Sequence, residues 1–125
     1  MIVLDASALL ALLFSEEGAD VVAPVLAESV MSTVNMAEVL GRFTRDGHDS
    51  NLVRRGLLRS PVEWVDFDTT QATLAASLLP ATRAMGLSLG DRACLALALQ
   101  RGRAAMTADR AWHKLRVGVE IHLIR

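Results

Sequence analysis

Short apolar runs alternate with longer amphipathic segments along the whole chain. The apolar runs predict strands at residues 1–5, 29–32, 62–67, 104–107 and 118–123. The segments between them predict helices at about 6–14, 17–28, 33–46, 49–59, 68–79, 90–101 and 109–115. Pro80 is expected to break the helix before it and to leave a short helical piece to about residue 85. Short apolar strands separated by helices predict a parallel sheet covered on both faces, an α/β layered domain.

Length and composition favour one globular domain spanning residues 1–125. A chain of 125 residues buries roughly two-thirds of the surface that it exposes when unfolded. Apolar residues make up 52% of the sequence and charged residues 22%, and no apolar run reaches the 18 residues of a membrane span. The first residues lack the basic region and cleavage site of a signal peptide, so we expect a cytoplasmic protein without a membrane partner.

The charge is nearly balanced overall but uneven locally. A net charge of −1 argues against tight, nonspecific binding of nucleic acid by the whole domain. Residues 41–60 nevertheless contain five arginines and two acids: Arg42, Arg45, Arg54, Arg55 and Arg59 against Asp46 and Asp49. The planar arginine fork suits phosphate contacts, whereas the alternative is a pair of solvated helices with no ligand.

Acidic residues stand at the ends of the apolar runs. Asp5 closes the first strand, Asp109 follows the 104–107 strand, and Asp91 begins an almost wholly apolar helix. In open parallel sheets, ligands bind beyond the carboxyl ends of the strands, where the strand order reverses. If the first strand and the 104–107 strand are neighbours there, these acids converge. Because lone buried carboxylates are costly, we expect them to share a cation or to face water.

Each acid also has a purely structural interpretation. Asp5 or Ser7 would cap the first helix, Ser88 and Asp91 match a capping box, and Asp109 or Thr107 would cap the next helix. Glu38 lies with Asn35 and Arg42 on the polar stripe of its helix, where Glu38 and Arg42 form a favourable i,i+4 pair. Capping does not predict all of these acids at once in one α/β framework.

Four ordered motifs, at 2–7, 32–39, 86–98 and 107–112, resemble those of PIN-domain proteins. They read Ile-Val-Leu-Asp-Ala-Ser, Ser-Thr-Val-Asn-Met-Ala-Glu-Val, Gly-Leu-Ser-Leu-Gly-Asp-Arg-Ala-Cys-Leu-Ala-Leu-Ala and Thr-Ala-Asp-Arg-Ala-Trp. Among PIN proteins the chain is most similar to the VapC-type toxins of bacterial toxin-antitoxin pairs. The resemblance implies a three-layer α/β/α sandwich with a parallel five-stranded sheet. It places Asp5, Glu38, Asp91 and Asp109 at the positions of the family's acidic quartet, with Ser7, Asn35 and Thr107 as polar supports.

The resemblance further implies an endoribonuclease that depends on Mg²⁺ or Mn²⁺. It also implies a homodimer and a cognate VapB-type antitoxin whose C-terminal segment covers the active site. The chemistry agrees, because hard oxygen ligands without a histidine and cysteine cluster favour Mg²⁺ or Mn²⁺ over zinc. We expect Asp5 and Asp91 to be direct or water-mediated metal ligands, Asp109 to bind through water, and Glu38 to orient the attacking water or act as general base. Arg92 is expected either to contact phosphate or to be a surface or carboxylate-pairing arginine.

Other functions remain open at this point. The alternatives are a DNA-directed nuclease of the wider PIN-like group and a non-catalytic module that binds a metal or a partner. A haloacid-dehalogenase-like phosphatase would need an acid where the chain has Ser7, and a receiver-like domain would have to use Lys114, which follows the wrong element. Cys94 is expected to be a buried thiol, Trp64 and Trp112 to be core or interface residues, and the three histidines to be structural or on the surface.

Overall fold

The computed structural model describes all 125 residues and has a central parallel sheet. Its strands are β1 (Ile2–Leu4), β2 (Ser29–Ser32), β3 (Glu63–Val65), β4 (Ala105–Thr107) and β5 (Ile121–Leu123). They pair in the order β3-β2-β1-β4-β5, and every pairing is parallel. The predicted five-stranded α/β fold is therefore confirmed. β1 pairs with β4, which is the condition set above for convergence of the acids, and the strand order reverses between these two strands.

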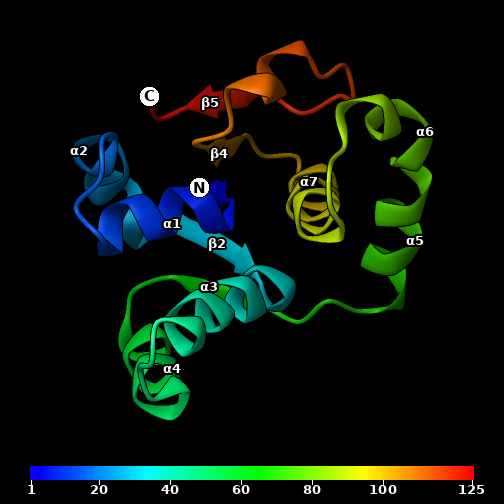
Figure 1. Ribbon diagram of the computed structural model, residues 1–125. Coiled ribbons are helices and arrows are strands. Elements are labelled where there is room, and N and C mark those ends of the chain that lie inside the picture. The colour runs from blue at the N-terminus through cyan, green and yellow to red at the C-terminus, as the bar shows by residue number, and fades with distance from the viewer.

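Helices cover both faces of the sheet. The α-helices are α1 (Ala6–Leu13), α2 (Ala19–Val22), α3 (Thr33–Arg45), α4 (Ser50–Arg59), α5 (Thr69–Ser77), α6 (Leu79–Thr82) and α7 (Leu89–Arg101). Three 3₁₀ segments complete the chain: η1 (Ala23–Glu28), η2 (Arg83–Met85) and η3 (Arg110–Lys114). Figure 1 shows α1 and α2 on one side of the molecule, α5 and α6 on the other, and α3 and α4 packed together as a hairpin.

Alternating residues of the strands supply two separate cores. In β1, Ile2 and Leu4 belong to the core under α1, α3 and α4, whereas Val3 belongs to the core under α7. This division follows from the pleat, because successive side chains of a strand point to opposite faces. Both cores meet at β1, so the residue that follows Leu4 emerges at the centre of the sheet rather than at an edge.

The elements differ from the predicted ones mainly at two places. The helix expected at 17–28 is a short α2 followed by the 3₁₀ segment η1, because Pro24 near the start of η1 provides no backbone N–H for an α-helical ladder. The helix expected at 109–115 is also a 3₁₀ segment, η3. The predicted break at Pro80 is confirmed, since α5 ends at Ser77 and Pro80 lies in the first turn of α6.

The residues expected to be structural are buried as predicted. Cys94 is a free, fully buried thiol inside α7, and Trp112 is 0% exposed. Trp64 is partly buried and donates its indole N–H to the carbonyl of Leu57 at 3.0 Å. None of the helices combines the length and the apolar character that crossing a membrane requires.

Candidate active site

Asp5 follows β1 directly and is almost completely buried, with 4% of its surface exposed. It occupies the N-cap position of α1, but its side chain makes no capping hydrogen bond. Capping therefore does not explain this carboxylate, although it was one of the two interpretations that the sequence left open. A buried acid at the carboxyl end of the central strand, where the strand order reverses, is positioned to bind a ligand.

Two hydroxyl groups hold one oxygen of Asp5. Ser7 Oγ and Thr107 Oγ1 both donate to Asp5 Oδ2, at 2.7 Å and 3.0 Å. Since each hydroxyl has a single proton, both protons are used on the carboxylate. The same two hydroxyls accept the backbone N–H groups of Ala108 and Asp109, each at 3.0 Å. The network thus fixes Oδ2, and Oδ1 accepts no hydrogen bond from the chain.

The charge on Asp5 is destabilised by its surroundings. Burial is the main reason that its pKa is raised to about 6, and the negative charges of Asp91 and Glu38 raise it further. The hydrogen bonds from Ser7 and Thr107 act in the opposite direction. Three carboxylates from separate segments, Asp5, Glu38 and Asp91, therefore lie close enough to repel one another. Burial raises the pKa of the Cys94 thiol, and the charges of the same three carboxylates raise it further.

Asp91 lies in the first turn of α7 and completes a capping box with Ser88. Ser88 Oγ accepts the backbone N–H of Asp91 at 3.2 Å, and Asp91 Oδ2 accepts the backbone N–H of Ser88 at 2.8 Å. The capping interpretation is thus correct for one oxygen of Asp91. The other oxygen, Oδ1, has no partner in the chain. Asp91 can therefore both begin the helix and offer a free oxygen.

Glu38 reaches the same region from α3, although the residue is exposed. Its Oε1 accepts a hydrogen bond of 2.8 Å from Asn35 Nδ2, which also donates to the carbonyl oxygen of Gly90 in α7 at 3.1 Å. Burial raises the pKa of Glu38, the Asn35 hydrogen bond lowers it, and the charge of Asp91 raises it. The i,i+4 pair predicted between Glu38 and Arg42 does not form, because Arg42 instead pairs with Asp46 at 3.3 Å.

The orientation of the Asn35 amide is fixed by its contacts. Both of its protons are donated to oxygen acceptors, and its Oδ1 is buried without a partner. A flipped amide would turn Oδ1 toward a carboxylate and a carbonyl, which are acceptors only. The unpaired oxygen is therefore the consequence of holding Glu38 and Gly90 together, and such a buried unpaired group costs about 1–3 kcal/mol.

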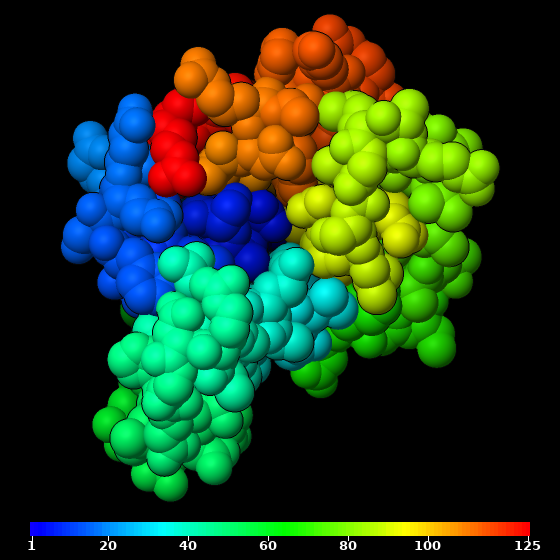
Figure 2. All heavy atoms as spheres, in the orientation of Figure 1, coloured from blue at the N-terminus to red at the C-terminus, as the bar shows by residue number.

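Asp109 differs from the other acids in its role at the site. It is exposed and caps η3, with Oδ1 accepting the backbone N–H of Ala111 at 3.0 Å. It is not among the charges that raise the pKa of Asp5. Its link to the site runs through its own backbone N–H, which donates to Thr107 Oγ1. Figure 2 shows the four segments that carry the acids meeting at the centre of one face: blue after β1, cyan at the start of α3, yellow-green at the start of α7 and orange after β4.

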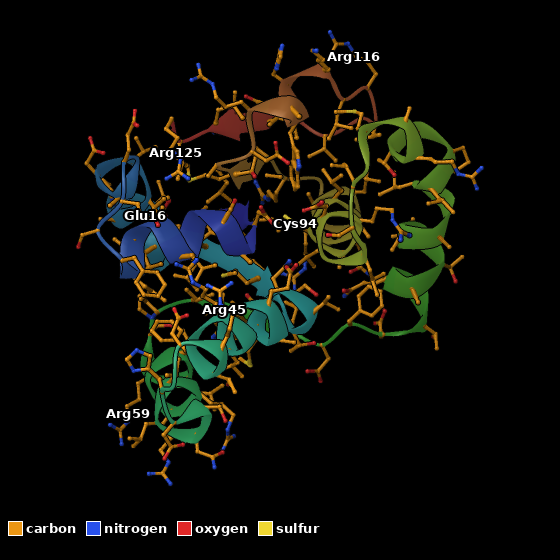
Figure 3. The ribbon with its side chains drawn as sticks, in the orientation of Figure 1. Glu16, Arg45, Arg59, Cys94, Arg116 and Arg125 are labelled. Atoms are coloured by element: carbon orange, nitrogen blue, oxygen red, sulfur yellow. The ribbon has the colours of Figure 1, made fainter.

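The arginines of α3 and α4 divide into two groups. Arg42 and Arg45 both contact Asp46 at 3.3 Å, and Arg42 also lies 4.7 Å from the centre of the Phe14 ring. The other three are exposed and form no ion pair or side-chain hydrogen bond within the chain: Arg54, Arg55 and Arg59. In Figure 3, Arg59 projects outward from the α3–α4 hairpin, whereas Cys94 lies on α7 near the centre of the molecule.

Arg92 does not extend toward the acids. Its Nη1 donates to the carbonyl oxygen of Ala75 in α5 at 3.3 Å, and its Nε is buried without a partner. Arg92 thus ties α7 to α5. The carboxylate pairing that its position next to Asp91 had suggested is not formed, and the phosphate contact stays a prediction.

The acidic side chains fit a hard divalent cation by their chemistry. The donors are all oxygens, two of the carboxylates have raised pKa values, and Asp5 keeps one oxygen free of hydrogen bonds. No three acidic, histidine or cysteine side chains close around one point at coordinating distance. This open arrangement suits Mg²⁺, which keeps several waters and needs only one or two carboxylates.

Sequence reasoning missed Gly90. Its carbonyl accepts from Asn35, and the carboxylate of Glu38 occupies the place where a Cβ atom would stand. A signal was present in the sequence, since glycine is unfavourable within a helix and here directly precedes a helical aspartate. Which side chain fills the space above the glycine is decided by α3 and is not visible in the local sequence.

An apolar groove of about 320 Å³ opens between α1, α3 and α4. Its lining is mostly aliphatic and includes Leu9, Leu12, Phe43 and Leu57. Exposed leucines on α1 and α4 add to the apolar surface on these helices: Leu13, Leu52 and Leu58. Apolar surface of this kind, next to polar and charged groups, is typical of a protein-binding site.

Comparison with solved structures finds similar folds in toxin-antitoxin complexes. A toxin-antitoxin complex from Klebsiella pneumoniae matches with a TM-score of 0.72 and 17% identity, covering 97% of this chain and 100% of the other. DNA-bound VapBC from Salmonella typhimurium matches with a TM-score of 0.73 and 16% identity, over 99% and 98% of the two chains. FitAcB from Neisseria gonorrhoeae matches with a TM-score of 0.73 and 20% identity, over 99% and 98%. At such identities the likeness shows the fold alone.

The family assignment comes from the sequence. No curated protein matches the chain. The family model of the PIN domain matches residues 2–118, which includes all four segments that carry the acids. The chain therefore belongs to the PIN-domain family.

Proposed function

We propose that this protein is a metal-dependent endoribonuclease, the toxin of a VapBC-type toxin-antitoxin pair. The observation that carries the proposal is the convergence of Asp5, Glu38 and Asp91 at the point where the strand order reverses. PIN domains are generally nucleases that hydrolyse phosphodiester bonds, and similar folds occur in VapBC complexes. The acids alone would repel one another, so an active state needs a positive charge among them.

In this proposal Asp5 and Asp91 would hold Mg²⁺ or Mn²⁺, either directly or through water. The bound cation would lower the pKa of a water molecule and neutralise charge on the departing 3′-oxygen. Ser7 and Thr107 fix the Asp5 carboxylate by their two hydrogen bonds, so that its free oxygen keeps one direction. No side chain needs to act as nucleophile.

Glu38 is proposed to orient the attacking water and to accept its proton. Its raised pKa suits a general base, because a carboxylate with a low pKa is too weak a base to take the proton from the water. Asn35 holds Oε1 and leaves Oε2 free. Asp109, which caps η3, is proposed to act only through water at the edge of the site.

RNA is the proposed substrate, and the exposed α4 arginines are proposed to contact its phosphates: Arg54, Arg55 and Arg59. They are free of internal partners, as a phosphate-binding surface requires. Arg42 can contribute from α3 only by exchanging its pairing with Asp46. Arg92 is left out of the proposed surface because its guanidinium contacts α5.

A VapB-type antitoxin is the proposed partner, and the chain is proposed to form a homodimer in the cytoplasm. The solved complexes with a similar fold contain an antitoxin, which supports a protein partner for this chain. The apolar groove between α1, α3 and α4 offers a surface for it. An antitoxin segment that extended from this groove over the acids would block access of RNA.

The proposal is tested by cleavage of a labelled pool of structured RNA with purified protein freed of any antitoxin. The wild type and Asp5→Asn are each incubated with Mg²⁺, Mn²⁺ or EDTA. Cleavage is expected only by the wild type and only with metal. Cleavage by both proteins would reveal a contaminating nuclease, and single-stranded DNA as a parallel substrate separates a ribonuclease from a DNA-directed enzyme. A folded wild type that cleaves neither substrate nor total cellular RNA would refute the proposed activity.

A further inference from the structure

Gly90 leaves a space at the start of α7 that the Glu38 carboxylate fills. An ideal Cβ atom on Gly90 would overlap both oxygens and the carboxyl carbon of Glu38, far inside van der Waals contact. Gly90 is buried and lies directly before Asp91, in the first turn of α7. The φ angle of Gly90 is not positive, so the backbone conformation does not require a glycine at this position. The close approach of the Glu38 carboxylate is the remaining reason for a glycine at position 90.

Asn35 ties the same two groups together. Its amide donates at once to Glu38 Oε1 and to the Gly90 carbonyl oxygen, with distances of 2.8 Å and 3.1 Å. The carboxylate is thus held between an amide on its own helix and the bare backbone of α7. Any side chain at position 90 would remove the second of these surfaces. The Asn35 amide could then no longer keep both its hydrogen bond to Glu38 and its hydrogen bond to the Gly90 carbonyl of α7.

We infer that Gly90 is a positioning residue: its missing side chain lets the Glu38 carboxylate rest on the start of α7, beside Asp91. The role rests on the proposed nuclease function, in which Glu38 orients the attacking water. A methyl group at position 90 would push the carboxylate away from Asp91 and from the Asn35 amide. The backbone of α7 has no reason to move, because the overlapping atoms belong to the end of a flexible and exposed side chain.

The effect on activity and the effect on stability should therefore separate. Alanine is a better helix former than glycine, so Gly90→Ala should leave the melting temperature within a few degrees of the wild type. A displacement of about 1 Å in a catalytic group costs roughly a hundredfold in rate. We expect Gly90→Ala to fold normally and to lose about a hundredfold in RNA cleavage. The matched control is Gly41→Ala in α3, where an added Cβ meets nothing within 4 Å, and its activity should be unchanged.

A double mutant distinguishes positioning from a general effect on the helix. In a Glu38→Ala background no carboxylate is present for the methyl group to displace. Glu38→Ala and the double variant Glu38→Ala with Gly90→Ala should therefore cleave at the same rate. A hundredfold loss that persists in this background would overturn the inference, and so would a Gly90→Ala protein that no longer folds.

A spectroscopic measurement tests the contact even if the protein cleaves no RNA. The side-chain amide of Asn35 gives ¹H–¹⁵N NMR signals that report its two hydrogen bonds. These signals should move in Gly90→Ala in the same direction as in Glu38→Ala, and should stay in place in Gly41→Ala. Unmoved signals in Gly90→Ala would refute the inference about Gly90. Absence of cleavage by the wild type, with moved signals, would refute only the proposed nuclease function.

Discussion

Replacing Asp5 by asparagine is expected to stabilise the protein while it removes the proposed activity. The carboxylate is buried, and its pKa is raised from 3.8 to about 6, first by desolvation and then by Asp91 and Glu38. Asparagine has nearly the same shape and no charge. Its Oδ1 can accept the hydrogen bonds that Ser7 and Thr107 now donate to Asp5 Oδ2.

The size and the pH dependence of this effect follow from proton linkage. An acid with a higher pKa in the folded state binds its proton more tightly there. Protonation of Asp5 thus stabilises the folded state. This contribution to the free energy of unfolding is fully present below about pH 3.8 and is lost as the pH rises through about 6. The difference between the two pKa values corresponds to about 3 kcal/mol at high pH. Asp5→Asn should therefore gain up to about 3 kcal/mol at pH 8 and almost nothing at pH 4.

Urea unfolding at pH 4, 6 and 8 in the presence of EDTA measures the gain directly. In a thermal scan at pH 8, the melting temperature should rise by roughly 12 °C, at about 4 °C for each kcal/mol. The matched control is Asp49→Asn. Asp49 is an exposed N-cap of α4, where asparagine caps a helix as well as aspartate does. An Asp5→Asn protein that is no more stable than the wild type at pH 8, or whose gain does not depend on pH, would refute the electrostatic account.

Three further predictions concern the metal, the substrate and the support of Asp5. Mg²⁺ should raise the melting temperature of the wild type, since a dissociation constant of about 1 mM gives about 1.4 kcal/mol of added stability at roughly 10 mM Mg²⁺. Asp91→Asn should shrink this increment. An equal increment in both proteins, measured by scanning calorimetry, would exclude Asp91 as a ligand. Thr107→Val removes a hydrogen bond to the Asp5 carboxylate and should lower the free energy of unfolding by about 1.5–3 kcal/mol in urea at pH 8. The loss should be smaller at pH 4, where Asp5 is protonated. A loss independent of pH would point to packing instead. The three exposed α4 arginines are Arg54, Arg55 and Arg59. Replacing them with glutamine should weaken RNA binding in fluorescence titrations and reduce the slope of log K against log salt concentration by about 2–3. Arg103→Gln, at another exposed arginine, serves as the control, and an unchanged slope would identify the α4 arginines as a solvated surface.

Local rules predicted the elements well but could not choose between two roles for one residue. Ser88 and Asp91 were expected to cap a helix or to serve a metal site, and the structure uses one Asp91 oxygen for the cap while leaving the other free. Asp5 had the same two interpretations, and its cap is not made. The difference depends on whether another segment supplies donors to the carboxylate, as Thr107 does from 102 residues away.

Helical spacing gave a wrong partner for Glu38. The i,i+4 rule predicted Arg42, yet Arg42 contacts Asp46 and Phe14 instead. Arg92 likewise stands next to Asp91 in sequence but points toward α5, because successive residues of a helix face different directions. In both cases a neighbouring element supplied a partner that the local sequence does not show.

The sequence by itself determined the strands, most of the helices and the places where acids follow apolar runs, because hydrophobic periodicity and helix signals act over a few residues. It also carried the motifs by which the chain is recognised as a PIN domain. Only the tertiary structure decided which acids converge, that Asp109 is exposed and caps η3, and that Gly90 makes room for Glu38. These features depend on strand order and helix packing, which join residues far apart in the chain and therefore have no local signature.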